Sequence, residues 1–137
     1  MKPASLVLVA ALGLCAAGPA LAHHSGAMYD RTRKVTVMGV VKDFQYTQPH
    51  SWIDLVSAEG SGKTVEWSFE AGAPGQMKGA GITPSVLKVG DKITVVGYPL
   101  KDGRPGGAFL ELTLPDGKVL STGRKADAAA VGEKPPG

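Results

Sequence analysis

Residues 71–90 read AGAPGQMKGAGITPSVLKVG, and they form the one long interval of the central sequence in which the alternation of apolar and polar residues stops. The interval can supply only one or two short helical turns, because proline and glycine are the poorest helix formers. Three segments with strand-like alternation precede it and two follow it. The position of this interval therefore decides which β-fold the chain adopts.

The three preceding segments alternate with the period of two that is typical of half-buried strands. They are residues 35–44 (VTVMGVVKDF), 51–56 (SWIDLV) and 64–70 (TVEWSFE). A polar, glycine-bearing turn at 59–63 predicts that the second and third form a hairpin. Gly39 predicts a bulge or a sharp bend in the first strand. The side chains predicted to face inward are Val35, Val37, Gly39, Val41, Ile53, Leu55, Val65, Trp67 and Phe69.

Two further strands are predicted after the interval, at 92–100 (KITVVGYPL) and 108–114 (AFLELTL), and a short last strand near Val119. Three strands, a short helical connection and two strands is the order of an oligonucleotide/oligosaccharide-binding (OB) barrel. A small β-sandwich is the main alternative. The sequence thus predicts an all-β, OB-like barrel of five to six strands, with a short helical connection between the third and fourth strands.

The first 22 residues have the layout of a secretory signal peptide. An apolar run at 5–17 follows Lys2, ends at Gly18-Pro19 and is succeeded by the small-residue triplet Ala20-Leu21-Ala22. This run is shorter than the ~20 residues that a permanent membrane-spanning helix needs. We therefore assign 1–22 to a signal-peptide helix that is removed. The expected product begins at His23, is periplasmic or secreted, and has no stable membrane insertion.

The rest of the chain is expected to have three parts. Residues 23–34 form an N-terminal arm and 35–121 form the barrel domain. Residues 122–137 form a tail that we expect to be disordered, because charge, Ala, Gly and Pro occur there without periodicity. The only cysteine, Cys15, lies in the signal peptide. The processed protein therefore has no disulfide and depends on a packed core.

Charge and motifs narrow the classes of function. The chain has 15 Lys and Arg against 12 Asp and Glu, and no basic cluster with interleaved aromatic residues, which argues against nucleic acid as a ligand. Ser25 and Ser51 adjoin histidines, but adjacency along a chain does not create a nucleophile and base pair, and no G-x-S-x-G motif occurs. We therefore predict a binding protein for a metal ion or small ligand rather than an enzyme. The sequence does not identify a protein partner.

The three histidines of the chain are His23, His24 and His50. The simplest interpretation is that the first two are a solvated fringe and that His50 is a turn residue after Pro49. Cleavage after Ala22, however, would give His23 a free α-amine, whose pKa of ~7.7 leaves it partly unprotonated at neutral pH. That amine and the Nδ1 of the same residue can chelate one metal ion, and His50 can add a third nitrogen. This arrangement, a histidine brace, favours Cu(II).

The arm is long enough for this site, because residues 23–34 can span up to roughly 40 Å and could fold back along the first strand. The side chains that include candidates for a weaker ligand, or for an acceptor that orients an imidazole, are Met28, Tyr29, Asp30, Asp54 and Glu70. In a rival mode, the amine, a deprotonated amide and His24 bind copper as a flexible peptide. Zinc is less favoured than copper because the processed chain lacks thiolates and clear carboxylate ligands.

A metal-free function is the alternative. In this interpretation Tyr46, Trp52 and Trp67 form an aromatic surface that stacks on a small ligand, a glycan or a protein, as OB barrels often do. The alternation places Trp67 toward the core, so Tyr46 and Trp52 are the better ligand-contacting candidates.

Several short motifs of the chain are distinctive when taken together. They are His23-His24-Ser25, Tyr29-Asp30, Gly39-Val40-Val41, Gln48-Pro49-His50-Ser51-Trp52, Trp67-Ser68-Phe69-Glu70, Leu87-Lys88-Val89-Gly90-Asp91, Gly97-Tyr98-Pro99 and Asp102-Gly103. This set resembles an exported bacterial family known only as a domain of unknown function, DUF6152. The likeness covers roughly residues 23–121 and points to His23, His24, His50, Trp52, Trp67 and Glu70, but it implies no known activity. The chain departs from the family pattern at Gln48, where Asn usually precedes Pro-His, and at Gly26, where a bulky aromatic residue usually stands.

Overall fold

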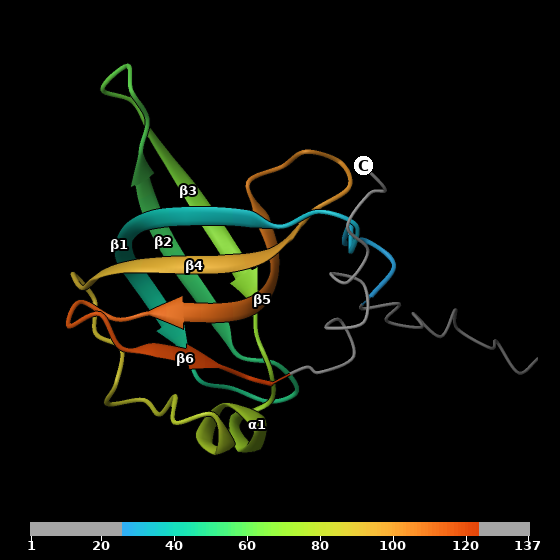
Figure 1. The fold of residues 1–137 in the computed structure, drawn as a ribbon, viewed down its shortest axis with the longest axis vertical. Coiled ribbons are helices and arrows are strands. Elements are labelled where there is room, and N and C mark those ends of the chain that lie inside the picture. The colour runs from blue at the N-terminus through green and yellow to red at the C-terminus, as the bar shows by residue number, and fades with distance from the viewer. Residues whose placement is uncertain (1–25, 124–137) are drawn as a thin grey trace, which may run out of the picture.

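The computed structural model describes residues 26–123 (Figure 1). The predicted signal peptide at 1–22 and most of the predicted tail lie outside this range. Within it, the elements in chain order are β1 (Val35–Gln45), β2 (Trp52–Ala58), β3 (Thr64–Glu70), α1 (Pro74–Gly79), β4 (Lys92–Pro99), β5 (Gly106–Thr113) and β6 (Val119–Ser121). The predicted order of three strands, a short helix and two strands, followed by a short last strand, is confirmed.

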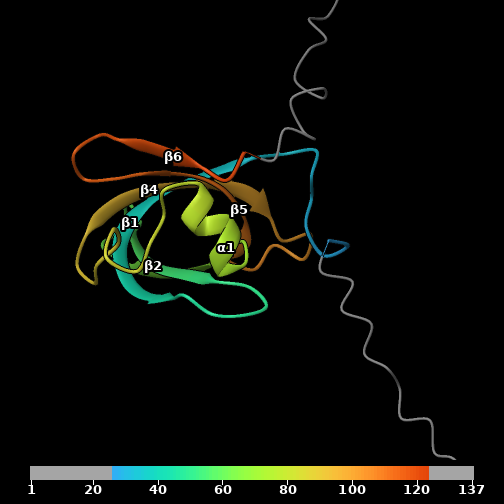
Figure 2. The ribbon, with the colours of Figure 1, turned by 90° about the horizontal axis from the view of Figure 1, so that it is seen from below.

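The strands form one sheet that closes on itself. Their order is β3-β2-β1-β4-β5-β6, and a parallel pairing of β3 with β5 joins the sheet into a five-stranded barrel, with β6 as an additional strand on β5. The barrel is OB-like, and the β-sandwich alternative is wrong because a single sheet is present in residues 26–123. Figure 2 shows α1 lying across one end of the barrel.

The barrel interior is filled by the inward-facing apolar side chains of the strands and by residues of the α1 connection. Met77 of α1 and Ile82 after it are fully buried, so the connection closes the end of the barrel that it crosses. Trp67 is half-buried and packs against this core. The fully or nearly fully buried members are Val37, Val41, Ile53, Leu55, Phe69, Ala71, Met77, Ile82, Leu87, Ile93, Val95, Phe109, Leu112 and Leu120.

The bulge in β1 lies between Val41 and Asp43, where the register with β2 shifts, and not at Gly39 as the sequence predicts. Gly39 lies in regular pairing with β4, just before β1 begins to pair with β2 at Val40. A Cβ at Gly39 would lie 2.6 Å from the carbonyl oxygen of Val56. Glycine is therefore needed at this position because β2 approaches closely.

Two strand boundaries also differ from expectation. β2 continues to Ala58, and β5 begins at Gly106 rather than at residue 108. Gly106 and Gly107 belong to β5 because they pair with Ser68 and Phe69 at the closure of the barrel. A Cβ at Gly107 would lie 2.4 Å from the carbonyl oxygen of Tyr98, so a side chain does not fit at this seam.

Candidate functional site

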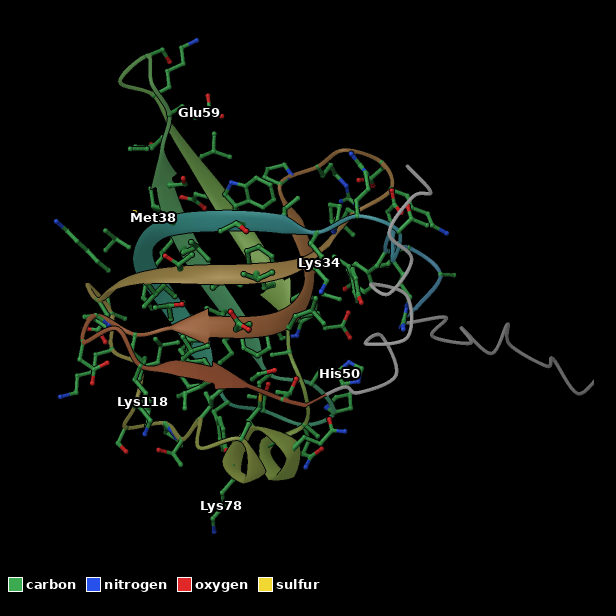
Figure 3. All side chains as sticks on the ribbon, viewed as in Figure 1. Lys34, Met38, His50, Glu59, Lys78 and Lys118 are labelled. Carbon is green, nitrogen blue, oxygen red and sulfur yellow. The ribbon has the colours of Figure 1, made fainter. Side chains whose placement is uncertain are left out.

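The loop between β1 and β2 holds His50 at the rim of the barrel (Figure 3). Beyond the last regular β2–β3 pair, the amide of Ser51 donates to the carbonyl of Gly72 at 3.0 Å, and the amide of Ala71 donates to the carbonyl of Ser51 at 2.8 Å. The Thr47 hydroxyl donates to the His50 carbonyl at 3.0 Å. The main chain of His50 is thus fixed on both sides, while its side chain stays 37% exposed.

Glu70, the last residue of β3, joins His50 to Tyr29. One carboxylate oxygen of Glu70 forms an ion pair with His50 Nδ1, and the other accepts a hydrogen bond from the Tyr29 hydroxyl. The Glu70 side chain is 13% exposed and Tyr29 is almost fully buried. We call these three residues the His50–Glu70–Tyr29 cluster. A carboxylate at Nδ1 leaves Nε2 as the imidazole nitrogen that can bind another group.

Burial raises the pKa of Tyr29 above its ordinary value, and the hydrogen bond to Glu70 and the negative charge of that carboxylate raise it further. Tyr29 therefore stays a neutral hydrogen-bond donor at any physiological pH. Its role in the cluster is to hold one oxygen of Glu70 in place, which directs the other oxygen toward His50.

The arm that carries Tyr29 is attached to the end of β4. Tyr29 forms an isolated antiparallel bridge with Leu100. The amide of Asp30 donates to the carbonyl of Pro99 at 2.8 Å, and the amide of Lys101 donates to the carbonyl of Met28 at 2.9 Å. These backbone contacts bring the N-terminal side of the chain to the end of β3, where Glu70 lies.

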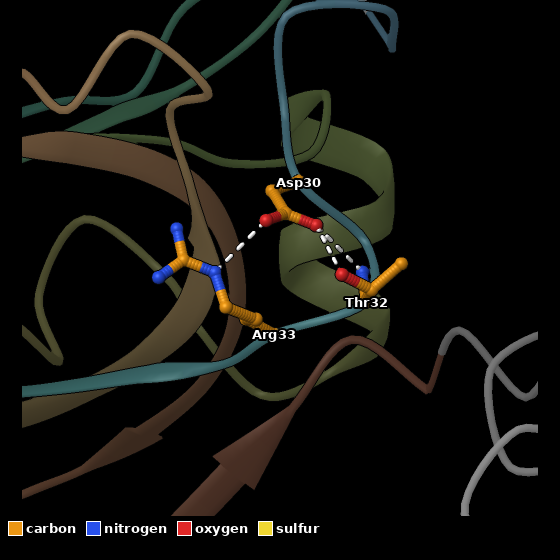
Figure 4. Close-up of polar contacts among 3 residues, drawn as sticks. All are labelled: Asp30, Thr32 and Arg33. Carbon is orange, nitrogen blue, oxygen red and sulfur yellow. Dashed lines mark hydrogen bonds and ion pairs between the residues drawn. The ribbon is translucent and has the colours of Figure 1, made fainter.

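Asp30 stabilises the turn of the arm and is engaged by its own neighbours (Figure 4). Its carboxylate accepts from the Thr32 amide at 3.0 Å, the Thr32 hydroxyl at 2.5 Å and Arg33 Nε at 2.9 Å. The side-chain bond from Thr32 and then that from Arg33 lower the pKa of Asp30 to about 2. Its predicted role as an acceptor for an imidazole is filled instead by Glu70.

A small polar cavity of about 90 Å³ lies at the cluster. Its wall includes Gly26 and Arg31 in addition to the three cluster residues. Gly26 is the first residue that the structure describes, and it follows His23 by three positions. His23 and His24, the other predicted ligands, lie outside the described residues. Arg31 was not predicted, and no sequence pattern distinguishes it from the other basic residues of the arm.

Asp54 and Tyr46 do not line the cavity at the His50–Glu70–Tyr29 cluster. Asp54, on β2, accepts a hydrogen bond from the Ser68 hydroxyl at 2.5 Å. The Tyr46 hydroxyl donates to the carbonyl of Pro74 at 2.6 Å, and its ring packs edge-on against Phe44. Tyr46 therefore connects the end of β1 to α1.

The two tryptophans line different cavities. Trp52 lines a cavity of about 420 Å³ between the arm and the turn that follows β4. Trp67 stacks on Phe69 with ring centroids 5.9 Å apart and lines a cavity of about 520 Å³ beside β1. Tyr46, Trp52 and Trp67 thus do not line one common cavity among those described here.

Residues 26–123 contain no group of three or more His, Cys, Asp or Glu side chains placed to hold a metal ion. They also contain no helix with the length and apolar character needed to cross a membrane.

The fold and the site define a small OB-like barrel with a histidine, carboxylate and tyrosine cluster at its rim. Residues 11–109 match the model of a family described as a family of unknown function, DUF6152, and the chain belongs to this family. A search of curated proteins finds no match.

Proposed function

We propose that the processed protein binds Cu(II) through a histidine brace and acts as an exported copper carrier or sensor. The ligands in this proposal are the α-amine and Nδ1 of His23 and the Nε2 of His50. The observation that carries the proposal is the contact between Glu70 and His50 Nδ1 in a small cavity that Gly26 also lines.

The Glu70 contact supports a ligand role for His50. A metal-binding histidine usually gives its other ring nitrogen to a carboxylate, which fixes the tautomer and increases the basicity of the ligating nitrogen. Glu70 is itself held by the buried Tyr29, so the imidazole is oriented by a chain of two contacts. A histidine that served only as a turn residue would not need this second support.

The position of Gly26 supports the participation of His23. Three residues span at most about 10 Å, so His23 is within reach of the cavity that Gly26 and His50 share. The cavity volume of about 90 Å³ lies well below the roughly 300–1,000 Å³ of sites for organic ligands, which favours a metal ion as the occupant. An organic ligand of ordinary size would not fit there.

Copper is favoured over zinc by the ligand set. A chelating amine, its own imidazole and a second imidazole form a nitrogen-rich, near-planar set, which Cu(II) prefers by geometry and by the Irving-Williams order. The two carboxylates of the neighbourhood are engaged, Glu70 by the cluster and Asp30 by its turn. We propose no catalytic role for the site.

A competition titration against a chelator of known Cu(II) affinity tests the proposal, with protein whose start at His23 has been verified by intact mass. His50→Ala should weaken Cu(II) binding at least about 100-fold, because it removes one of three ligands. The loss of a residue that only supports a metal ligand already costs about 10–100-fold in metal affinity. His24→Ala is the matched control and should weaken binding much less.

The opposite ranking would contradict the brace. If His50→Ala binds as tightly as wild type while His24→Ala does not, copper is bound by the flexible terminal peptide alone. If wild-type protein binds no tighter than a synthetic peptide of its first residues, the folded domain contributes nothing and the proposal is wrong.

A further inference from the structure

The cavity that Trp52 lines has no part in the proposed copper site. Its volume of about 420 Å³ lies within the range of small-molecule sites, roughly 300–1,000 Å³. It is walled by three parts of the chain that are distant in sequence: the arm, the outer face of the β2–β3 hairpin and the turn between β4 and β5. The residues that define it are Met28, Tyr29, Trp52, Leu100, Arg104 and Pro105.

Trp52 supplies a large apolar face that is not covered by the core. It lies opposite Glu70 in the β2–β3 register, on the outer face of the hairpin, and it is half-buried. Met28, which lines the same cavity, is 48% exposed. A ligand with one flat apolar side could therefore bury both its own face and that of Trp52.

The charged side chain that lines the cavity is Arg104, in the turn between β4 and β5, and its ion-pair partner Asp102 is not itself a lining residue. Asp102 accepts from the Arg104 amide at 3.0 Å and from Arg104 Nε at 2.7 Å. This pairing uses Nε and leaves the terminal guanidinium nitrogens as donors. The pair is also electrically neutral, so it offers no net attraction to an anionic ligand, and Asp102 opposes one.

We propose that this cavity binds a neutral carbohydrate, with a sugar ring stacked on Trp52 and its hydroxyls bound by Arg104. A sugar ring has one apolar face of C–H groups and an edge of hydroxyls that both donate and accept. That combination matches an aromatic face beside the terminal guanidinium nitrogens of Arg104, which donate to hydroxyl oxygens. The negative charge of Asp102 at Arg104 disfavours a carboxylate or phosphate ligand.

The carbohydrate site adjoins the copper site but is independent of it. Tyr29 lines both cavities, while its hydroxyl belongs to the His50–Glu70–Tyr29 cluster. His50, the proposed copper ligand that lies within residues 26–123, does not line the carbohydrate cavity. Sugar binding is therefore expected in protein from which metal has been removed, and its test does not depend on the copper proposal.

The test is a tryptophan fluorescence titration of metal-stripped protein with four neutral disaccharides: maltose, cellobiose, lactose and N,N′-diacetylchitobiose. At least one should give a saturable change with a Kd below about 10 mM. Trp52→Ala should weaken binding at least about tenfold by calorimetry. Arg104→Gln lies in an exposed turn and is expected to fold normally, so it should weaken the same binding without loss of structure by circular dichroism.

Trp67→Phe is the matched control, because Trp67 lines a different cavity, and it should leave the affinity unchanged. If none of the four sugars binds, or if binding is lost in Trp67→Phe but retained in Trp52→Ala, the proposal is wrong. Indole, a flat ring without hydroxyls, distinguishes a carbohydrate site from a cavity that binds any flat apolar molecule. If it binds as tightly as the best sugar and is insensitive to Arg104→Gln, the carbohydrate assignment is overturned.

Discussion

Replacing Glu70 by Gln tests the His50–Glu70–Tyr29 cluster without any metal. One oxygen of the Glu70 carboxylate accepts from the Tyr29 hydroxyl, and the other forms an ion pair with His50 Nδ1. A glutamine amide is neutral and has one accepting oxygen and one donating nitrogen. It can keep only one of the two contacts, and it places its own amino group against the other partner.

The expected loss follows from the burial of the two partners. A hydrogen bond to a charged group contributes about 1.5–3 kcal/mol, and a buried donor left unpaired costs about 1–3 kcal/mol. The contact with Tyr29 is buried and contributes most of this free energy. The contact with His50 contributes less, because the His50 side chain is more than a third exposed and water screens the charge. We therefore expect Glu70→Gln to lower the free energy of unfolding by about 2 kcal/mol, or Tm by about 10 °C.

The assay is urea and thermal denaturation at pH 7 in the presence of a chelator, with Glu66→Gln as the matched control. Glu66 lies on the same strand and pairs with Lys42, but both side chains are more than half exposed, so its loss should cost at most about 0.5 kcal/mol. If Glu70→Gln destabilises the protein no more than Glu66→Gln does, the cluster is not held together as described.

Three further substitutions have definite expected outcomes. Ser51→Ala should raise the free energy of unfolding by about 1 kcal/mol in urea denaturation, because the Ser51 hydroxyl is fully buried and has no hydrogen-bond partner within residues 26–123; a lower stability would contradict this. Gly107→Ala should cost about 3 kcal/mol in the same assay, since its Cβ would lie 2.4 Å from the Tyr98 carbonyl oxygen, and an unchanged stability would show that the seam can open. Tyr29→Phe should flatten the alkaline limb of a stability-pH profile. The raised pKa of Tyr29 means that the folded state keeps a proton that the unfolded state loses. The contribution of Tyr29 to wild-type stability is therefore constant below about pH 10 and falls above it, and equal limbs in both proteins would refute this cause.

The strands and their order could be predicted from the sequence because alternation and the glycine- and proline-rich interval are local signals. The same local signals predict that β5 begins at residue 108, which leaves Gly106 and Gly107 outside it, since glycine is locally a turn residue. Their membership of β5 depends on the close approach of β3 and β4 at the seam, which no local pattern records. The bulge likewise lies after Val41 and not at Gly39, the glycine that marks it in the sequence.

The site was predicted as a set of candidates but not as an arrangement. Tyr29 and Glu70 were both named, yet they are 41 residues apart and meet only because the arm pairs with Leu100 and β3 closes against β5. Asp30 was a candidate for the same role as an acceptor for an imidazole. Thr32 and Arg33, two and three positions later, are a local signal for a self-capped turn and explain its different role.

The central claim is that the α-amine of His23 is a copper ligand, and one added residue tests it most directly. A single glycine placed before His23 changes the amine into an amide nitrogen of low basicity and leaves every side chain intact. The measurement is Cu(II) affinity by chelator competition for the processed protein and for this extended form. We expect the extension to lower the Cu(II) affinity at least about 100-fold, which is equivalent to about 2.7 kcal/mol of binding free energy. Equal affinities in the two forms would contradict the histidine brace.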